Sequence, residues 1–227
     1  GVSSAASDVY KRQMNYSQLE TLVKDYKISE IYHLAAILSA KGEENPMLTW
    51  DINMNSLFNV LELARNKAIE KVFWPSSISV FGINTPKIET DQFSIKEPTT
   101  AYGISKLAGE RWCEYYNFKY NTDIRSVRFP GIISSNTLPG GGTTDYAVEI
   151  FYSFLKNEKY NCFLNKKSML PMIYIDDAIE SIYKLMLADK ENLSIKSSYN
   201  LASFSLSPEI IEKELKKIDN SFAVEYN

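Results

Sequence analysis

The sequence has 227 residues, of which 44% are hydrophobic, so it can bury the core of one large domain or one and a half. Its 25 basic and 28 acidic side chains give a formal net charge of -3, and no basic face with interleaved aromatic residues is visible. A nucleic-acid partner is therefore not expected.

Metal sites and membrane spans are not expected either. Two cysteines, Cys113 and Cys162, and one histidine, His33, are too few for a tetrahedral zinc site built from these residues. The longest apolar stretch, residues 31–40, is interrupted by polar side chains well before the ~18 residues that a bilayer requires. With no signal peptide visible, we expect a soluble protein in a reducing, cytoplasmic setting, with no membrane partner and with both cysteines buried.

The first thirteen residues are polar and carry no strand pattern. Residues 3–13, SSAASDVYKRQ, resemble the in-frame translation of a transposase sequencing adapter over eleven consecutive codons. We therefore predict that the segment 1–13 is not native protein, and we exclude it from the prediction of the fold.

From Asn15 onward, helical and strand patterns alternate. Helices are predicted at residues 16–26, 46–67 and 99–120, and strands at residues 30–36, 71–82 and 124–129. Strands separated by helices of this length predict an α/β fold with a parallel, doubly wound sheet, whose ligands bind outside the carboxyl ends of the strands. Beyond Ser134 we predict helices near 143–157, from 176 and after 207, and a strand near 171–175.

Two domains follow from this order. Residues 14–135, with a return segment near 171–188, are predicted to form a partial dinucleotide-binding domain that lacks its first strand, helix and strand. Residues 136–227 are predicted to form a smaller substrate-binding lobe.

The stretch PTTAYGISKLAGE places Tyr102 and Lys106 four residues apart near the start of a predicted helix. At this spacing the two side chains share one helix face and can both reach the ends of the strands. A neighbouring ammonium and a cationic nicotinamide favour the phenolate and lower the pKa of a tyrosine toward neutral pH. Tyr102 could then act as general base while the Ser77 hydroxyl orients the substrate oxygen. Such pairs also occur on solvated helix faces, so the pair alone does not indicate catalysis. The surrounding motifs decide between the two interpretations.

Five motifs, HLAA, DINMNS, PSSISVFG, AYGISKLAGE and RFPGII, resemble in order and spacing the extended short-chain dehydrogenases/reductases, which include nucleotide-sugar epimerases and dehydratases. The resemblance covers nearly all of residues 15–227 and implies a Rossmann-like fold that binds NAD. It also implies that Tyr102, Lys106 and Ser77 are catalytic. The cofactor-binding residues that it implies are Leu34, Ala35, Ala36, Asn53, Ser76, Tyr102, Lys106, Pro130 and Ile132.

Three further stretches, AAILSAKGEENP, PGGGTTDYAVEIFY and LPMIYIDDAI, resemble the short-chain family of L-threonine 3-dehydrogenases. This resemblance implies oxidation of the 3-hydroxyl of L-threonine by NAD to 2-amino-3-oxobutyrate, in threonine catabolism and without a metal. It also implies a homodimer that pairs through the predicted helices 46–67 and 99–120. The apolar positions expected to serve that pairing are Leu57, Leu61, Trp112 and Tyr116. The implied substrate-binding residues are Ser39, Ser77, Tyr102, Thr143 and Thr144.

The sequence departs from these families at both ends. It has neither the glycine-rich loop nor the acidic residue that would select NAD over NADP, and the families continue beyond the final VEYN. We therefore predict a chain truncated at both ends, and expect it to bind NAD weakly or to fold poorly.

Two alternative functions stay open. A nucleotide-sugar epimerase or dehydratase would use the same tyrosine chemistry, but such enzymes normally carry an asparagine where Pro130-Gly131 stands. A non-catalytic NAD(P)-sensing protein would not need to retain all three catalytic residues. Thr143 and Thr144 could also simply cap the helix that follows them.

Overall fold

The computed structural model describes residues 14–136, 138, 140 and 142–226, and the predicted non-native segment 1–13 lies outside this range. The chain divides into two compact units. The first runs to Arg128 and also contains Ile182–Asn200, and the second contains Phe129–Ser181 and the residues from Leu201 onward. The strands at 131–133 and 170–174 thus belong to the second unit, whereas the predicted domain boundaries assigned them to the first.

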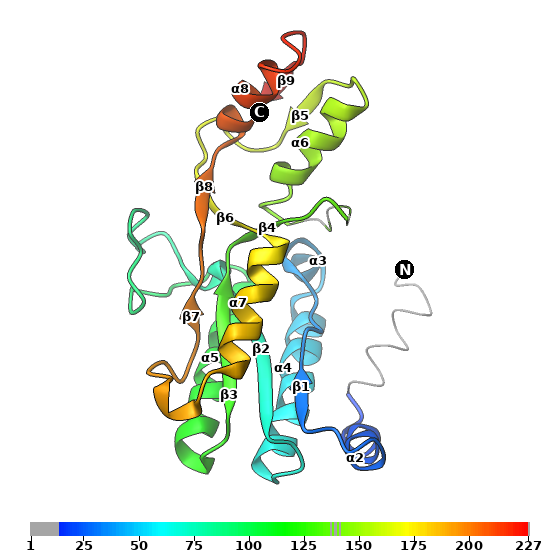
Figure 1. The fold of residues 1–227 in the computed structure, drawn as a ribbon, viewed down its shortest axis with the longest axis vertical. Coiled ribbons are helices and arrows are strands. Elements are labelled where there is room, and N and C mark those ends of the chain that lie inside the picture. The colour runs from blue at the N-terminus through cyan, green and yellow to red at the C-terminus, as the bar shows by residue number, and fades with distance from the viewer. Residues whose placement is uncertain (1–13, 137, 139, 141, 227) are drawn as a thin grey trace. The chain divides into compact units, whose positions relative to one another are not determined.

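The first unit is built on a four-stranded sheet with the order β1-β2-β3-β7 (Figure 1). Strand β1 pairs in parallel with β2, with Ile31 opposite Val72, and β3 pairs in parallel with β7, with Val127 opposite Tyr199. The predicted parallel sheet is confirmed. The strands are β1 (Glu30–Tyr32), β2 (Lys71–Ser77), β3 (Ile124–Phe129) and β7 (Tyr199–Asn200). The helices are α2 (Tyr16–Asp25), α3 (Ser39–Glu44), α4 (Pro46–Arg65), α5 (Ala101–Tyr120) and the last turns of α7 (Ile175–Leu187), with 3₁₀ turns at Ile78–Val80 and Lys190–Asn192.

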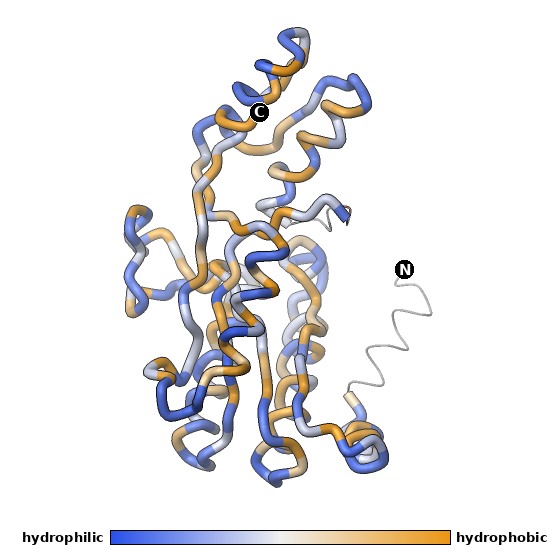
Figure 2. Tube along the Cα trace, viewed as in Figure 1, coloured by the Kyte–Doolittle hydropathy of each residue, from blue (hydrophilic) through white to orange (hydrophobic). Residues whose placement is uncertain are grey.

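Local sequence signals set the ends of the two long helices. Asn45 accepts a hydrogen bond from the Leu48 amide, and Pro46 occupies the first turn of α4, where its missing N–H costs nothing. Helix α5 ends at Tyr120, and the next residue, Asn121, has a left-handed backbone (φ 53°), which asparagine tolerates better than most residues. Figure 2 shows hydrophobic and hydrophilic residues alternating along the helices, as expected of elements with one buried face.

One apolar cluster forms the core of the first unit. It joins the inner faces of α4 and α5 to β2, and its buried members are Val23, Met54, Leu57, Val60, Leu61, Leu63, Ala64, Ile69, Val72, Trp74, Cys113, Tyr116 and Ile124. Three of the four positions expected to serve a dimer, Leu57, Leu61 and Tyr116, lie in this core, so that expectation was wrong for them. Only Trp112 among the four stays 40% exposed.

The second unit contains a three-stranded and a two-stranded sheet, ordered β4-β6-β8 and β5-β9. Gly131 of β4 lies opposite Met172 of β6 in a parallel pair, and β6 runs antiparallel to β8. The strands are β4 (Gly131–Ile133), β5 (Tyr160–Cys162), β6 (Leu170–Tyr174), β8 (Phe204–Leu206) and β9 (Val224–Tyr226). Helices α6 (Tyr146–Leu155) and α8 (Pro208–Lys216) pack on a separate core that includes Tyr146, Ile150 and Ile211.

Two predicted strands are shorter than expected. The strand at 30–36 ends at Tyr32, and the Asn53 side chain then binds the backbone of Ile37 on both its N–H and its carbonyl. The strand at 71–82 ends at Ser77, because the Ser77 hydroxyl accepts the Ser79 amide and turns the chain into a 3₁₀ turn. Among the described residues, every helix is too short or too polar to span a bilayer.

Candidate active site

Tyr102 lies in the first turn of α5. The Thr100 side chain begins this helix by accepting the Gly103 amide at 3.0 Å. A Cβ atom at position 103 would lie 2.4 Å from the Ser79 carbonyl oxygen, so only glycine lets this turn pack so closely on the chain that follows β2. The phenol of Tyr102 is thereby held at the carboxyl end of β2.

Ser77, the last residue of β2, lies near the phenol of Tyr102. Burial raises the pKa of Tyr102, and hydrogen bonding by the Ser77 side chain acts in the opposite direction. The expected fall of the Tyr102 pKa toward neutral is therefore not a property of the chain alone, because desolvation outweighs the other effects. Ser77 also accepts the Ser79 amide at 3.1 Å, so its own proton remains available to the phenol.

The ammonium of Lys106 lies one helical turn further along α5. It donates a hydrogen bond of 2.6 Å to the Pro75 carbonyl and lies 4.6 Å from the centroid of the Trp74 ring and 5.5 Å from that of Tyr102. Lys106 is buried, and this burial lowers the pKa of its ammonium to about 8. Among the described residues, Pro75 supplies the one hydrogen-bond acceptor of this ammonium, so two of its three protons remain for a ligand.

The segment after β1 is hydrogen-bonded to β2 and to α4. His33 donates its backbone amide to the Phe73 carbonyl, and its ring nitrogen Nε2 lies 3.2 Å from the Ser56 hydroxyl. Burial lowers the pKa of His33 to about 4, which keeps the ring neutral at physiological pH, as expected of a packed residue. Leu34, by contrast, is 64% exposed, and Ala35 and Ala36 are partly exposed.

Asn53 connects this segment to the helix of Tyr102. Its carboxamide oxygen accepts the Ile37 amide at 2.7 Å, and its nitrogen donates to the hydroxyl of Ser105 at 3.3 Å. Ser105 in turn donates to the Tyr102 carbonyl at 2.7 Å. Ser39, the predicted substrate contact on this side, is the first residue of α3 and is partly exposed.

The remaining predicted site residues belong to the second unit. Pro130 is buried, Ile132 is 40% exposed, and Thr143 is exposed. Thr144 packs on Gly131, where an added Cβ would lie 2.6 Å from the Cβ of Thr144. These four residues are not among those that the first unit gathers around Tyr102, and their binding roles stay predictions.

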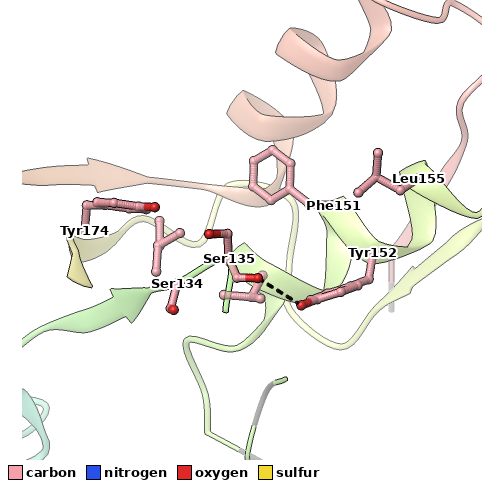
Figure 3. Close-up of a pocket in the computed structure, with 8 residues that line it drawn as sticks. Ser134, Ser135, Phe151, Tyr152, Leu155 and Tyr174 are labelled. Atoms are coloured by element: carbon pink, nitrogen blue, oxygen red, sulfur yellow. Dashed lines mark hydrogen bonds between the residues drawn. The ribbon is translucent and has the colours of Figure 1, made fainter. Parts of the chain in front are cut away.

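The second unit also carries an apolar groove of about 290 Å³ (Figure 3). Its wall includes three aromatic side chains, Phe151, Tyr152 and Tyr174, and the Tyr152 hydroxyl donates to the Ser135 carbonyl at 3.4 Å. The other lining residues are Ile133, Ser134, Val148 and Leu155. None of the predicted site residues lines this groove.

Comparison with known proteins identifies the family of the chain. Residues 8–202 match the NAD dependent epimerase/dehydratase family. The chain belongs to this family. It is 46% identical to an uncharacterized epimerase/dehydratase of Staphylococcus haemolyticus, over 93% of this chain and 66% of that relative. The chain thus spans slightly less than two thirds of the length of that curated relative.

Two solved structures give a closer comparison for this epimerase/dehydratase family member. The holo form of a GalE-like L-threonine dehydrogenase from Cupriavidus necator superposes with a TM-score of 0.93 at 48% identity, over 95% of this chain and 70% of that one. A monomeric L-threonine 3-dehydrogenase from a metagenome, in its apo form, superposes with a TM-score of 0.89 at 44% identity, over 95% of this chain and 69% of that one. The predicted Rossmann-like fold is confirmed.

Sequence reasoning missed one buried cluster of this family member. Ser76 was predicted to bind the cofactor, but its hydroxyl donates to Glu110 at 2.7 Å, and Glu110 forms a buried ion pair with Arg128. The signal that could have revealed Glu110 is its spacing, because Tyr102, Lys106 and Glu110 follow one another at intervals of four residues on α5.

Proposed function

We propose that this chain carries the catalytic residues of an NAD-dependent dehydrogenase that oxidises the 3-hydroxyl of L-threonine to 2-amino-3-oxobutyrate. The observation that carries the proposal is the buried ammonium of Lys106, which the Pro75 carbonyl holds one helical turn from Tyr102, with Ser77 at the end of the same strand. The L-threonine dehydrogenases among the solved structures support the choice of substrate.

The residues present fit a nicotinamide cofactor. Two protons of the Lys106 ammonium remain for the hydroxyls of a ribose, and Ala35 and Ala36, which are partly exposed beyond the end of β1, would contact the ligand. Leu34, Asn53, Pro130, Ile132 and the backbone of Ser76 would complete its contacts. When bound, NAD would supply the acceptor for the hydride that leaves the alcohol carbon.

In this proposal Tyr102 is the general base. Its phenolate would remove the proton of the 3-hydroxyl, and the Ser77 hydroxyl would hold the same substrate oxygen in line. Lys106 would remain largely protonated at neutral pH, because its pKa is about 8, and its charge would favour the phenolate. Ser39, Thr143 and Thr144 would hold the amino acid.

The test uses a chimera, because the sequence contains no G-x-G-x-x-G loop. Residues 14–227 would replace the matching segment of the Cupriavidus necator enzyme, so that Ser77, Tyr102 and Lys106 all come from this chain. We expect reduction of NAD that depends on L-threonine. Conversion of a UDP-sugar without any turnover of threonine would instead assign the chain to the nucleotide-sugar enzymes.

We also propose that the protein forms a homodimer through the outer faces of α4 and α5. Trp112 is 40% exposed and forms an edge-to-face contact with Phe58 across the two helices, with ring centroids 5.1 Å apart. Sedimentation of the chimera should show a dimer at micromolar concentration that Trp112→Glu dissociates. A monomer, as the metagenomic relative is described, would contradict this proposal.

A further inference from the structure

Three consecutive residues at the end of β2 contact three residues of α5 that are spaced by four. The Pro75 carbonyl accepts from Lys106 at 2.6 Å, Ser76 donates to Glu110 at 2.7 Å, and Ser77 lies near the phenol of Tyr102. The helix and the strand end therefore adjoin each other at three successive points. A shift of Ser76 relative to Glu110 would also displace its neighbours Pro75 and Ser77, which adjoin Lys106 and Tyr102.

The contact between Ser76 and Glu110 belongs to a buried network of polar side chains. Glu110 is 0% and Arg128 is 1% exposed. The guanidinium of Arg128 binds both carboxylate oxygens of Glu110, through Nε at 2.8 Å and Nη2 at 2.9 Å. Its remaining nitrogen, Nη1, donates to the Gln92 carbonyl at 3.0 Å and to the Asn200 side chain at 2.8 Å.

The hydrogen bonds of this network hold the side chains of Glu110 and Ser76 in fixed orientations. Bidentate pairing restricts Glu110 to one orientation, and the carboxylate oxygen Oε1 that accepts from Arg128 Nε also accepts the Ser76 hydroxyl. Each polar group of the cluster has a partner, and rotating Glu110 or Arg128 would leave a buried charge unpaired. Strand β2 is thereby linked to β3 and α5 immediately before Ser77.

We propose that Glu110 is a positioning residue that acts through Ser76 and, held in place by Arg128, keeps the Ser77 hydroxyl at the phenol of Tyr102. The proposal rests on the proposed function, in which that phenol is the base. Glu110 itself does not touch the substrate. The role of Ser76 in this network is carried by its side chain, whereas any contact of Ser76 with a cofactor is left to its backbone.

The test uses Ser76→Ala, which removes one hydrogen bond and leaves the ion pair intact. Ser126→Ala is the matched control, because Ser126 is likewise a buried serine, on β3, and its hydroxyl pairs with that of Ser198. The readout in the chain itself is the ¹³C signal of the Tyr102 ring carbon Cζ, identified by its loss in Tyr102→Phe. Ser77→Ala marks the position of this signal when the Ser77 hydroxyl is absent.

We expect the Tyr102 signal in Ser76→Ala to move at least halfway toward its position in Ser77→Ala, and to stay at the wild-type position in Ser126→Ala. Ser76→Thr, which keeps a hydroxyl, should return it toward wild type. An unchanged signal in Ser76→Ala, or an equal movement in Ser126→Ala, would overturn the proposal. If Ser76→Ala does not fold, Ser76→Cys, a weaker donor, is read against the same controls.

A kinetic arm uses the chimera. Loss of one hydrogen bond should lower kcat of Ser76→Ala about tenfold, with the KM for NAD unchanged, while Ser126→Ala keeps the wild-type kcat. A rise in KM with kcat unchanged would count against a role in positioning the base. A chimera that does not oxidise threonine at all would contradict the proposed function alone, since the ¹³C signal still decides whether Glu110 and Ser76 position Tyr102.

Discussion

The Lys106 ammonium donates a hydrogen bond of 2.6 Å to the backbone carbonyl of Pro75. The side chain of Lys106 is buried, and its charged head also lies over the Trp74 ring, 4.6 Å from the ring centroid. The positive charge is therefore fixed beside Tyr102 before any ligand arrives. A group that is already in place needs little reorganisation during the reaction.

Tyr102→Phe in the chimera tests whether Tyr102 accepts the proton while Lys106 binds the cofactor. The variant keeps the ring but removes the proposed proton acceptor, so we expect kcat on L-threonine to fall by about 10²–10⁴-fold. The dissociation constant for NADH, measured by fluorescence, should stay within about twofold, since the Lys106 contact with Pro75 is unaffected. Turnover close to wild type would show that another group accepts the proton.

Much of the first unit could be predicted because its signals are local. The spacing of Tyr102 and Lys106 on a helix follows from 3.6 residues per turn, and the caps at Asn45 and Thr100 mark helix starts in the sequence. Helix α3 could not be predicted in this way. It has six residues, and Leu38 precedes it without a side-chain cap, so neither periodicity nor a capping residue reveals it.

The parts of the site that escaped prediction depend on contacts between distant segments. Glu110 and Arg128 lie on different elements, and nothing in their local sequence says which acid pairs with which base. Asn53 was predicted as a site residue, but its contact with the backbone of Ile37 across the end of β1 was not. The short strands β4, β5, β7, β8 and β9 have at most three residues, too few for an alternating pattern.

Thr144→Ala should act on substrate binding and not on the chemical step. We expect the KM for L-threonine to rise about five- to tenfold, the cost of about one lost hydrogen bond, while kcat and the KM for NAD stay near wild type. The same measurement on Thr143→Ala tests the second proposed substrate contact, at the exposed neighbouring residue. Equal KM values for wild type and both variants would show that neither threonine contacts the substrate.

The stability of the chain should depend on pH through His33. Its pKa falls from 6.5 to about 4 because burial disfavours the charged ring. The unfolded state therefore binds a proton that the folded state does not, between these two values, so stability is full above about pH 6.5 and declines toward about pH 4. At about pH 5 the loss should be about 2 kcal/mol relative to about pH 7.5.

Urea unfolding of wild type and His33→Gln at both pH values measures this loss. The variant cannot titrate in this range, so the difference in unfolding free energy between the two pH values should be about 2 kcal/mol smaller than in wild type. The same pH dependence in both proteins would assign the effect to carboxylates elsewhere in the chain.

Gly109 of α5 should tolerate a methyl group poorly. A Cβ there would lie 2.4 Å and 2.5 Å from two ring carbons of Trp74, which is itself buried in the core. Alanine normally stabilises a helix by about 1 kcal/mol over glycine, but overpacking against a fixed indole costs about 1–3 kcal/mol. We therefore expect Gly109→Ala to lower the free energy of unfolding in urea, and to shift the Trp fluorescence.

Gly42→Ala in α3 is the matched control, because its Cβ would meet the Thr49 side chain at 3.3 Å, a distance that a small shift relieves. That variant should be neutral or slightly stabilised, and a Gly109→Ala chain as stable as Gly42→Ala would show that the indole of Trp74 can move aside.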